Sequence, residues 1–360
     1  MRPRVTNTPL LSVVMPARNA LPFLDAAVES ILGQTFGDFE FVIRDDGSTD
    51  GTAQRLREWA ARDRRIRLYE GEKLGPAGSS NWVVRQARAP LIARMDADDL
   101  SRPDRLERQR ALFAERRDLV LAGTLADTID AAGRTVRGAD LGRIGRNSSF
   151  APFAHTSIMF RRSAFDAVGG YRAACDYWED LDFCLRMAAV GRAAVIAEPL
   201  VSHRASASSV RLVHAEQDRV EAAVDRMFTS IDALARGESY EPIVARAGEA
   251  PPRVRPMAFV SINSNWLWAG ERPLLLGRLL HRGRLRPNLE TALTLGWATL
   301  AAVSPATLRL LLKGMVRARA LRVRGKVQRG EVHEWRPLEA VAQAAGPRRG
   351  RRGSALETAL

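Results

Sequence analysis

Apolar and polar residues alternate between two patterns, one typical of strands and one typical of helices, along the first third of the chain. Short β-rich runs are each followed by a segment in which apolar residues recur at helical spacing. The runs are LSVVM (11–15), FEFVI (39–43), IRLYE (66–70) and LIARM (91–95), and the helical segments are 21–32, 51–61, 79–87 and 103–116. Strands that alternate with such helices indicate a parallel sheet covered by helices. The pattern therefore predicts an open α/β domain.

The same reading extends to about residue 204. Residues 119–136 predict a strand and a hairpin with Ala-Gly at the turn, 155–162 a strand, 179–191 a helix that ends at Gly191, and 193–204 a strand that ends near His203. Residues 140–152 are rich in Gly, Asn and Ser and predict a mobile loop. Ser101 with Asp104 predicts a capping box, with Pro103 in the first helical turn.

Beyond residue 205 the β signal fades and helical patterns dominate. We therefore divide the chain into an α/β domain (10–204, with halves 10–123 and 124–204), a mainly helical region (205–346) and a disordered tail (347–360). Residues 291–308 carry no charge, but they barely reach the length of roughly 20 residues that a bilayer span needs. The basic stretch 305–326 fits an interfacial amphipathic helix, or equally a core-facing helix with a solvated basic face.

The charge of the chain is concentrated in its C-terminal part. The formal net charge is +14, of which +3 belongs to residues 1–204 and +11 to residues 205–360. Such a bias attracts polyanions, either nucleic acid or an anionic bilayer. Cys175 and Cys184 have neither metal-site nor disulfide-framework spacing, which suits a reducing cytosol. The N-terminal residues lack the pattern of a signal peptide, so we expect a cytoplasmic protein.

Polar clusters follow all four strands of the first half. They are PARN (16–19), RDDGSTDGT (44–52), GEKLGPAGSSN (71–81) and DADD (96–99). In open parallel sheets, ligands bind at the carboxyl ends of the strands, where loops and helix N-termini converge. The four clusters therefore predict one shared crevice.

The fourth cluster places Asp96, Asp98 and Asp99 within four positions, where their charges repel unless a cation neutralises them. Mg²⁺ or Mn²⁺ prefers oxygen ligands, and Mg²⁺ usually takes one or two carboxylates together with substrate phosphates. The simpler interpretation, helix capping, accounts for one carboxylate at most. At the second strand end, an acid commonly binds a ribose or base, while Asp50 and Ser48 fit a turn and cap.

These motifs carry a family resemblance. The stretch from LSVVMPARN to RDDGSTDGT, then DADDLSRPDRLERQ, HTSIMFRRSAFDAVGGYR and WEDLDFCLRMAAVG, resembles the family 2 glycosyltransferases of the GT-A fold over about residues 10–204. The resemblance implies a mostly parallel central sheet with covering helices. It also implies an inverting transfer of a sugar, typically UDP-linked, from a nucleoside diphosphate to an acceptor hydroxyl.

The resemblance also assigns roles to single residues. Pro16, Ala17, Arg18 and Asn19 would line the nucleotide, and Asp46 would hold the base. Asp96 and Asp98 form the DxD motif, with Asp99 beside them. Many relatives carry an aromatic residue where this chain has Arg18, so the stacking partner of the base is open. Metal acting as a Lewis acid would stabilise the departing diphosphate.

Asp180, in the acid pair of WEDLDF, would be the general base that takes the proton of the acceptor hydroxyl. By pattern alone, Glu179, Asp180 and Asp182 could equally well only favour the positive N-terminal end of a helix. His203 could complete the metal ligands with Asp98 and Asp99, or could be a hydrogen-bonded histidine without that role. His155 and Glu179 are candidate acceptor contacts.

Other functions fit the residues less well. A dehydrogenase would need Gly-x-Gly-x-x-Gly after the first strand, which PARNALPF lacks. A phosphatase with an aspartyl nucleophile would, by resemblance, carry its acids after the first strand. The rivals that stay open are a nucleic-acid-binding protein, suggested by the basic tail with Trp266, Trp268 and Trp335, and a non-catalytic sugar-nucleotide binder. For the enzyme we expect Mn²⁺ or Mg²⁺, a lipid-linked or saccharide acceptor, and attachment of the basic helices to the inner face of the cytoplasmic membrane.

Overall fold

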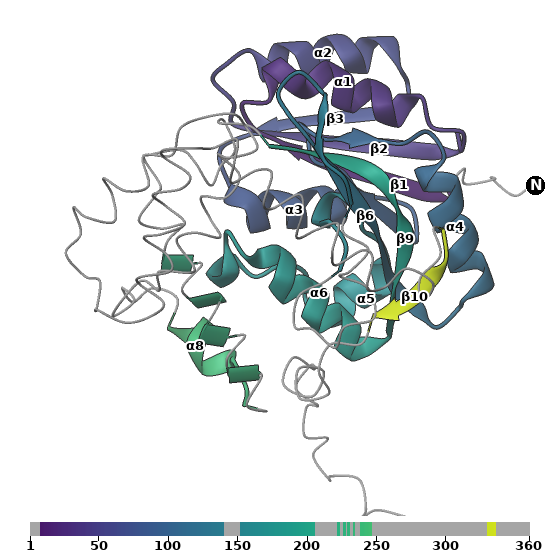
Figure 1. Ribbon diagram of the computed structural model, residues 1–360. Coiled ribbons are helices and arrows are strands. Elements are labelled where there is room, and N and C mark those ends of the chain that lie inside the picture. The colour runs from purple at the N-terminus through teal and green to yellow at the C-terminus, as the bar shows by residue number, and fades with distance from the viewer. Residues whose placement is uncertain are drawn as a thin grey trace, which may run out of the picture.

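Figure 1 shows the computed structural model of the chain. The structure describes residues 8–139, 152–205, 222–223, 226–227, 229–230, 233–234, 238–246 and 330–335. Its strands are β1 (Leu11–Ala17), β2 (Phe39–Asp46), β3 (Ile66–Gly71), β4 (Leu91–Arg94), β5 (Leu100–Ser101), β6 (Leu119–Ile129), β7 (Thr135–Arg137), β8 (Met159–Arg161), β9 (Arg192–Arg204) and β10 (Val332–Trp335). Its α-helices are α1 (Leu21–Leu32), α2 (Thr52–Arg62), α3 (Gly75–Gln86), α4 (Arg105–Glu115), α5 (Arg162–Val168), α6 (Glu179–Val190) and α8 (Glu241–Ala245), with 3₁₀ turns η2 (His155–Ser157) and η3 (Ala173–Cys175).

All the strands join one sheet, in the order β10-β9-β6-β8-β4-β1-β2-β3, with β5 paired to β9 and β7 to β6. The four strands β3, β2, β1 and β4 are mutually parallel, as the first-half pattern predicts. β8 runs antiparallel between β4 and β6. The predicted mixed α/β architecture, with parallel strands in its first half, is confirmed.

Helices cover both faces of the sheet (Figure 1). Successive residues of a strand point to opposite faces, so β1 contributes Val13 and Met15 to one apolar cluster and Val14 to another. The first cluster is completed by helices α1, α2 and α4, and the second by α3, α5 and α6. Burial on both faces explains why β1 and β2 are almost continuous runs of buried residues.

The long strand β9 changes partner along its length. Its first half pairs with β10, from Ala193 to Ile196, and its second half pairs with β5 through Val201 and Ser202. The register of β9 against β6 shifts near Pro199, between these two halves. The β5 pairing brings the end of β9 beside the residues that directly follow β4.

The structure corrects several local expectations. Ser101 lies in β5, where its hydroxyl accepts a hydrogen bond from Gln34 Nε2 at 3.1 Å, and Asp104 occupies the N-cap position of α4 without a side-chain cap. The predicted capping box is therefore wrong. The helix predicted over 79–87 begins earlier, at Gly75, as α3. A left-handed glycine (φ +81°) followed by proline suits a helix start.

Residues 155–157 form a 3₁₀ turn, so the predicted strand shortens to β8; α5 and β10 were not predicted. The predicted loop at 140–152, except its last residue, lies outside the described residues, and so do the uncharged stretch 291–308, the basic stretch 305–326 and the tail 347–360. Over the residues that are described, no helix combines the length and the apolar character that crossing a bilayer requires. The division of the chain at residue 204 stays a prediction.

Candidate active site

The polar clusters that follow the first strands lie at one edge of the sheet. In the parallel register, Ala17 of β1 is level with Asp45 of β2, and Asp46 is level with Gly71 of β3. Val14 of β1 is level with Arg94 at the end of β4. The sequence prediction that these strand ends share one side of the domain is confirmed.

The loops after β1 and β2 are tied to each other. Arg18 Nη1 donates to the carbonyl oxygens of Asp46 (2.7 Å) and Gly47 (3.2 Å). Asn19, whose backbone is left-handed (φ +48°), donates its N–H to the Ser48 hydroxyl at 2.9 Å and accepts the N–H of Thr49 on Oδ1 at 2.9 Å. Pro16 to Asn19, predicted to line a nucleotide, thus stand directly beside the acidic loop after β2.

Asp46 joins the second and third strand ends. Its Oδ1 accepts the N–H of Leu74 at 2.9 Å, and its Oδ2 accepts the N–H of Gly75 at 3.1 Å, at the start of α3. The neighbouring Asp45 accepts the N–H of Ser48 at 3.0 Å in a turn. Asp50 accepts the N–H groups of Leu21 and Thr52, the first residues of α1 and α2, while Gly51 occupies the N-cap position of α2.

Buried arginines form ion pairs and hydrogen bonds with the DADD cluster. Asp96 forms an ion pair with Arg94, and its N–H donates to the Thr156 hydroxyl at 3.1 Å. Asp99 accepts the N–H of Arg204 on Oδ1 at 2.8 Å, and Arg204 Nε donates to the carbonyl of Asp98 at 2.8 Å. β9 therefore fixes the backbone of the cluster, and Arg94 neutralises its first acid.

Asp98 and Asp99 have strongly shifted acidities. Burial, followed by the charges of Asp99 and Asp96, raises the pKa of Asp98 to about 7 from its ordinary value of 3.8. Burial and the charge of Asp96 raise the pKa of Asp99 to about 7. His203, exposed at the end of β9, lies near enough to lower the pKa of Asp98. The role of Asp98 and Asp99 as metal ligands, together with that of His203, stays a prediction.

These residues fit a divalent cation by their chemistry. Asp99 Oδ2 is buried without a hydrogen bond of normal geometry, although the nearby Thr156 hydroxyl lowers the pKa of this acid. Two carboxylates that burial and repulsion keep from ionising are the groups that a cation would relieve. In the part of the chain that the structure describes, no three His, Cys, Asp or Glu side chains are arranged so that they could hold a metal ion. A bound cation would therefore need further oxygen ligands, and substrate phosphates supply these in many sites.

Three arginines of this site were missed by the sequence analysis. Arg94 is buried and sits in the otherwise apolar run LIARM, which is the one signal that could have found it. Arg105 is fully buried and donates to the carbonyls of Thr156 (3.0 Å) and Arg94 (3.1 Å), and burial lowers its pKa to about 10. Arg204, which holds Asp98, also has a pKa lowered by burial.

Printed contacts link the DADD cluster to α6. Asp96 donates its N–H to Thr156, the adjacent His155 contacts Tyr171, and the Tyr171 ring stacks on Phe183 of α6. Against the effect of burial, the charges of Asp96 and, less strongly, Glu179 raise the pKa of Arg94 above its usual range. The next residue, Asp180, is partly exposed, and its Oδ1 accepts the N–H of Leu181 at 2.7 Å. The segment before the helix is strained, because Tyr177 has φ +72°.

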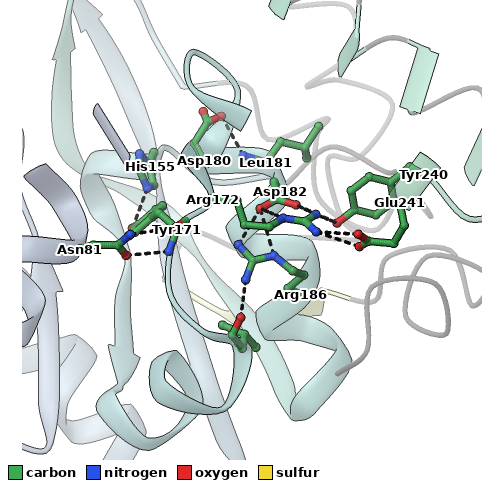
Figure 2. Close-up of polar contacts among 11 residues, drawn as sticks. Asn81, His155, Tyr171, Arg172, Asp180, Leu181, Asp182, Arg186, Tyr240 and Glu241 are labelled. Atoms are coloured by element: carbon green, nitrogen blue, oxygen red, sulfur yellow. Dashed lines mark hydrogen bonds and ion pairs between the residues drawn. The ribbon is translucent and has the colours of Figure 1, made fainter. Parts of the chain in front are cut away.

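His155 is placed by an aromatic partner. Its Nε2 lies 3.0 Å from the hydroxyl of Tyr171, and the two rings meet edge to face. Asn81 holds the backbone of Tyr171 on both sides, because its Oδ1 accepts the N–H and its Nδ2 donates to the carbonyl, each at 2.8 Å. Figure 2 shows this group beside the first turn of α6. The acceptor roles of His155 and Glu179 stay predictions.

The sequence has clear relatives among characterised families. Residues 12–169 match the family described as Glycosyl transferase family 2. The chain is 37% identical over 186 residues to EpsE, a Bacillus subtilis protein assigned as a glycosyltransferase, with 49% of this chain and 66% of EpsE covered. It is 34% identical over 187 residues to chondroitin synthase of Escherichia coli, with 51% of this chain but only 27% of the synthase covered. The chain thus spans less than two thirds of these two relatives.

Another relative is covered more fully. The O-antigen biosynthesis glycosyltransferase WbnJ of Escherichia coli is 30% identical over 183 residues, with 49% of this chain and 71% of WbnJ covered. Among solved structures, the mannosyltransferase PcManGT from Pyrobaculum calidifontis, in complex with GDP-Man and Mn²⁺, is 20% identical, with a TM-score of 0.48 over 90% of this chain and 89% of that one. From the sequence matches, which cover the strand-end acids described above, the chain belongs to glycosyltransferase family 2.

Proposed function

We propose that the chain is an inverting glycosyltransferase that moves a sugar from a nucleoside-diphosphate sugar to an acceptor hydroxyl. The observation that carries the proposal is the series of contacts from Asp96 through Thr156, and from the adjacent His155 through Tyr171, to Phe183 of α6. Through these contacts, the acids proposed to bind the donor diphosphate and the acids at the start of α6 belong to one site. Family membership supports sugar transfer as the reaction.

The loops at the strand ends would hold the nucleotide. Arg18 and Asn19 stand beside the loop that Asp46 anchors, and this arrangement presents backbone and side-chain groups from the first two strand ends together. Asp98, Asp99 and His203 would hold a divalent cation, with Asp96 beside them. When bound, the cation would supply Lewis-acid stabilisation of the departing diphosphate. The chain's own contribution there is to keep two acids close and poorly solvated, so that neutralising them is favourable.

Asp180 would take the proton of the acceptor hydroxyl. A general base needs to lie within hydrogen-bond reach of its proton and to keep a free lone pair. The carboxylate of Asp180 is partly exposed and accepts the N–H of Leu181 on Oδ1. A carboxylate offers about four acceptor positions, so this hydrogen bond does not by itself prevent Asp180 from accepting a proton.

The acceptor would be a saccharide or a lipid-linked sugar. Two relatives are named for chondroitin synthesis and O-antigen biosynthesis, which supports a surface polysaccharide as the product. Attachment to an anionic membrane through residues 305–326 belongs to the same proposal. Flotation with anionic liposomes at low salt tests the attachment, and protein that stays at the bottom of the gradient would exclude it.

The nucleic-acid alternative loses part of its support. Trp335, one of the three tryptophans that suggested it, is 4% exposed and packs edge to face against Phe153. A buried ring of this kind is not available to stack on bases. Trp266 and Trp268 lie outside the described residues.

The test measures release of nucleoside diphosphate from a panel of UDP-, GDP- and dTDP-sugars with MnCl₂. With the best donor of the panel, Asp180→Asn should lower kcat by about 10²–10⁴-fold, the usual worth of a general base, and leave UDP affinity in calorimetry unchanged. Asp98→Ala should instead remove Mn²⁺-dependent UDP binding. Asp166→Asn, at an exposed acid on α5, is the matched control. Turnover of Asp180→Asn above about 10% of the original would exclude Asp180 as the base.

A further inference from the structure

A buried polar network lies beside the first turn of α6, and two of its members come from beyond residue 205. Its centre is Asp182, which is fully buried. Asp182 accepts hydrogen bonds from Arg186 (Nη2, 2.6 Å), Arg172 (Nε, 3.1 Å) and the Tyr240 hydroxyl (2.9 Å). We call Arg172, Asp182, Arg186, Tyr240 and Glu241 the α6 hub (Figure 2).

Tyr240 and Glu241 close the hub from the start of α8. The Tyr240 hydroxyl accepts a bond from Arg172 Nη2 at 3.1 Å, and its buried ring lies under the Arg172 guanidinium, 5.4 Å away. Both carboxylate oxygens of Glu241 accept Arg172 Nη1, at 2.8 and 2.9 Å. The two residues therefore accept hydrogen bonds from the guanidinium group of Arg172, which also donates to Asp182.

The strained segment before α6 packs against Tyr240 of the hub. A non-glycine residue with positive φ, such as Tyr177 (φ +72°), persists only where its surroundings fix it. On one side, Asp176 Oδ1 accepts the N–H of Ala77 in α3 at 3.0 Å. On the other side, the Trp178 ring meets the Tyr240 ring edge to face, 6.2 Å between centroids. Tyr240 thus packs against the residue that directly precedes Glu179 and Asp180.

Fixing Asp182 also fixes the direction of Asp180. Successive helical residues are turned by about 100°, so residues two apart point to roughly opposite sides of the helix. Figure 2 shows Asp182 pointing into the hub and Asp180 pointing away from it. The hub therefore sets the rotation of the first turn of α6, and with it the direction in which the Asp180 carboxylate points.

We propose that Tyr240 and Glu241 are positioning residues for Asp180, so that the region beyond residue 205 tunes the transfer step. The proposal rests on the function proposed for Asp180. Neither residue is expected to touch the donor, because the predicted nucleotide loops are anchored through Asp46 and Arg18 instead. Loosening the hub should therefore misdirect the base and leave donor binding intact.

The experiment compares Tyr240→Phe, Glu241→Gln and the double variant with the wild type, using the best donor of the sugar-nucleotide panel. Tyr240→Phe keeps the ring against Trp178 and Glu241→Gln keeps the side-chain shape, so both variants should fold. Misplacing a catalytic group by about 1 Å can cost about 10²-fold in rate, so we expect the double variant to lose about tenfold in kcat. The donor KM and the calorimetric Kd for UDP should stay within about twofold, since uniform binding is untouched. Arg246→Gln, an exposed residue on the same segment, is the matched control.

A double-mutant cycle separates positioning from general destabilisation. If the hub acts through Asp180, the double variant should lower kcat no further in an Asp180→Asn background, because residues that act as a unit are not additive. An equal loss in both backgrounds, or a kcat of the double variant equal to that of Arg246→Gln, would overturn the proposal. Should the double variant not fold, the same cycle with each single variant decides. If instead the role proposed for Asp180 is wrong, the Asp180→Asn variant alone would keep full activity, and this result distinguishes the two failures.

Discussion

The acidity of Asp98 and Asp99 makes a prediction about the metal-free protein. Their pKa values, raised to about 7 in the folded chain, fall back to ordinary values when the chain unfolds. Between these limits the folded state binds more protons than the unfolded state, so stability falls as the pH rises. In EDTA, the protein should therefore be less stable at pH 8 than at pH 5.5.

The size of the effect follows from the width of the window. One carboxyl has a pKa of about 7 in the folded chain and of 3.8 in the unfolded chain. The free energy of unfolding therefore falls by about 1.4 kcal/mol for each pH unit between 5.5 and 7, or by about 2 kcal/mol in all. The two acids titrate as a pair, so we count one proton. A loss of this size lowers Tm by roughly 4–8 °C in a domain of about 200 residues. Acids whose pKa is lowered, such as Glu40 and Asp182, stay ionised in both states above pH 5.5 and contribute little.

Thermal unfolding in EDTA and in MnCl₂, at pH 5.5 and at pH 8, is the assay. Mn²⁺ binds the ionised acids, so it should raise Tm more at pH 8 than at pH 5.5. Asp98→Asn should raise Tm at pH 8 in EDTA and flatten the pH dependence, because one repelling charge is gone. Asp104→Asn, at a partly exposed acid nearby, should keep the wild-type slope and thereby account for titrating histidines. A wild-type protein equally stable at both pH values in EDTA, or a slope unchanged in Asp98→Asn, would refute the reasoning.

Three further predictions concern stability. Gly169 and Gly170 both have left-handed backbones (φ +76° and +74°), but a Cβ at Gly170 would lie 2.4 Å from Asn81 Oδ1 and one at Gly169 would meet nothing. Gly170→Ala should therefore cost at least about 3 kcal/mol against about 1 kcal/mol for Gly169→Ala in urea unfolding, and equal losses would contradict the contact. Asp46→Asn should cost about 1–3 kcal/mol because the amide that replaces the buried carboxylate can accept only one of the N–H groups of Leu74 and Gly75, whereas Asp38→Asn at an exposed position should be neutral by the same measurement. Trp335→Ala should cost about 3 kcal/mol through the cavity left beside Phe153, and a near-neutral result would place the ring outside the core.

The parallel half of the fold could be predicted because its information is local. An apolar run such as LSVVM, followed by polar residues and a helical pattern, specifies a strand and the edge at which it ends. For that reason the placement of Arg18, Asp46 and Asp98 at or close after the ends of parallel strands could be predicted before any contact was known. The acid triplet indicated a cation by charge alone.

The buried arginines were less accessible to sequence reasoning. Arg105 is held by the carbonyls of Arg94 and Thr156, the latter 51 positions away along the chain, so its burial depends on the completed fold. The role of Tyr240 is hidden for the same reason, because its partner Asp182 lies 58 positions earlier. VHEW, the sequence of β10, is too short to predict a strand until Ala193 to Ile196 are there to pair with it.

The pairing of β10 with β9 has a consequence for how the protein is made. The ribosome must add well over a hundred residues after Arg204 before Val332 to Trp335 can dock. Throughout that interval the first half of β9 presents unpaired N–H and C=O groups, which invite association with other nascent chains. Translation pauses within this interval, or truncation before Val332, should therefore favour aggregation over release of the folded protein.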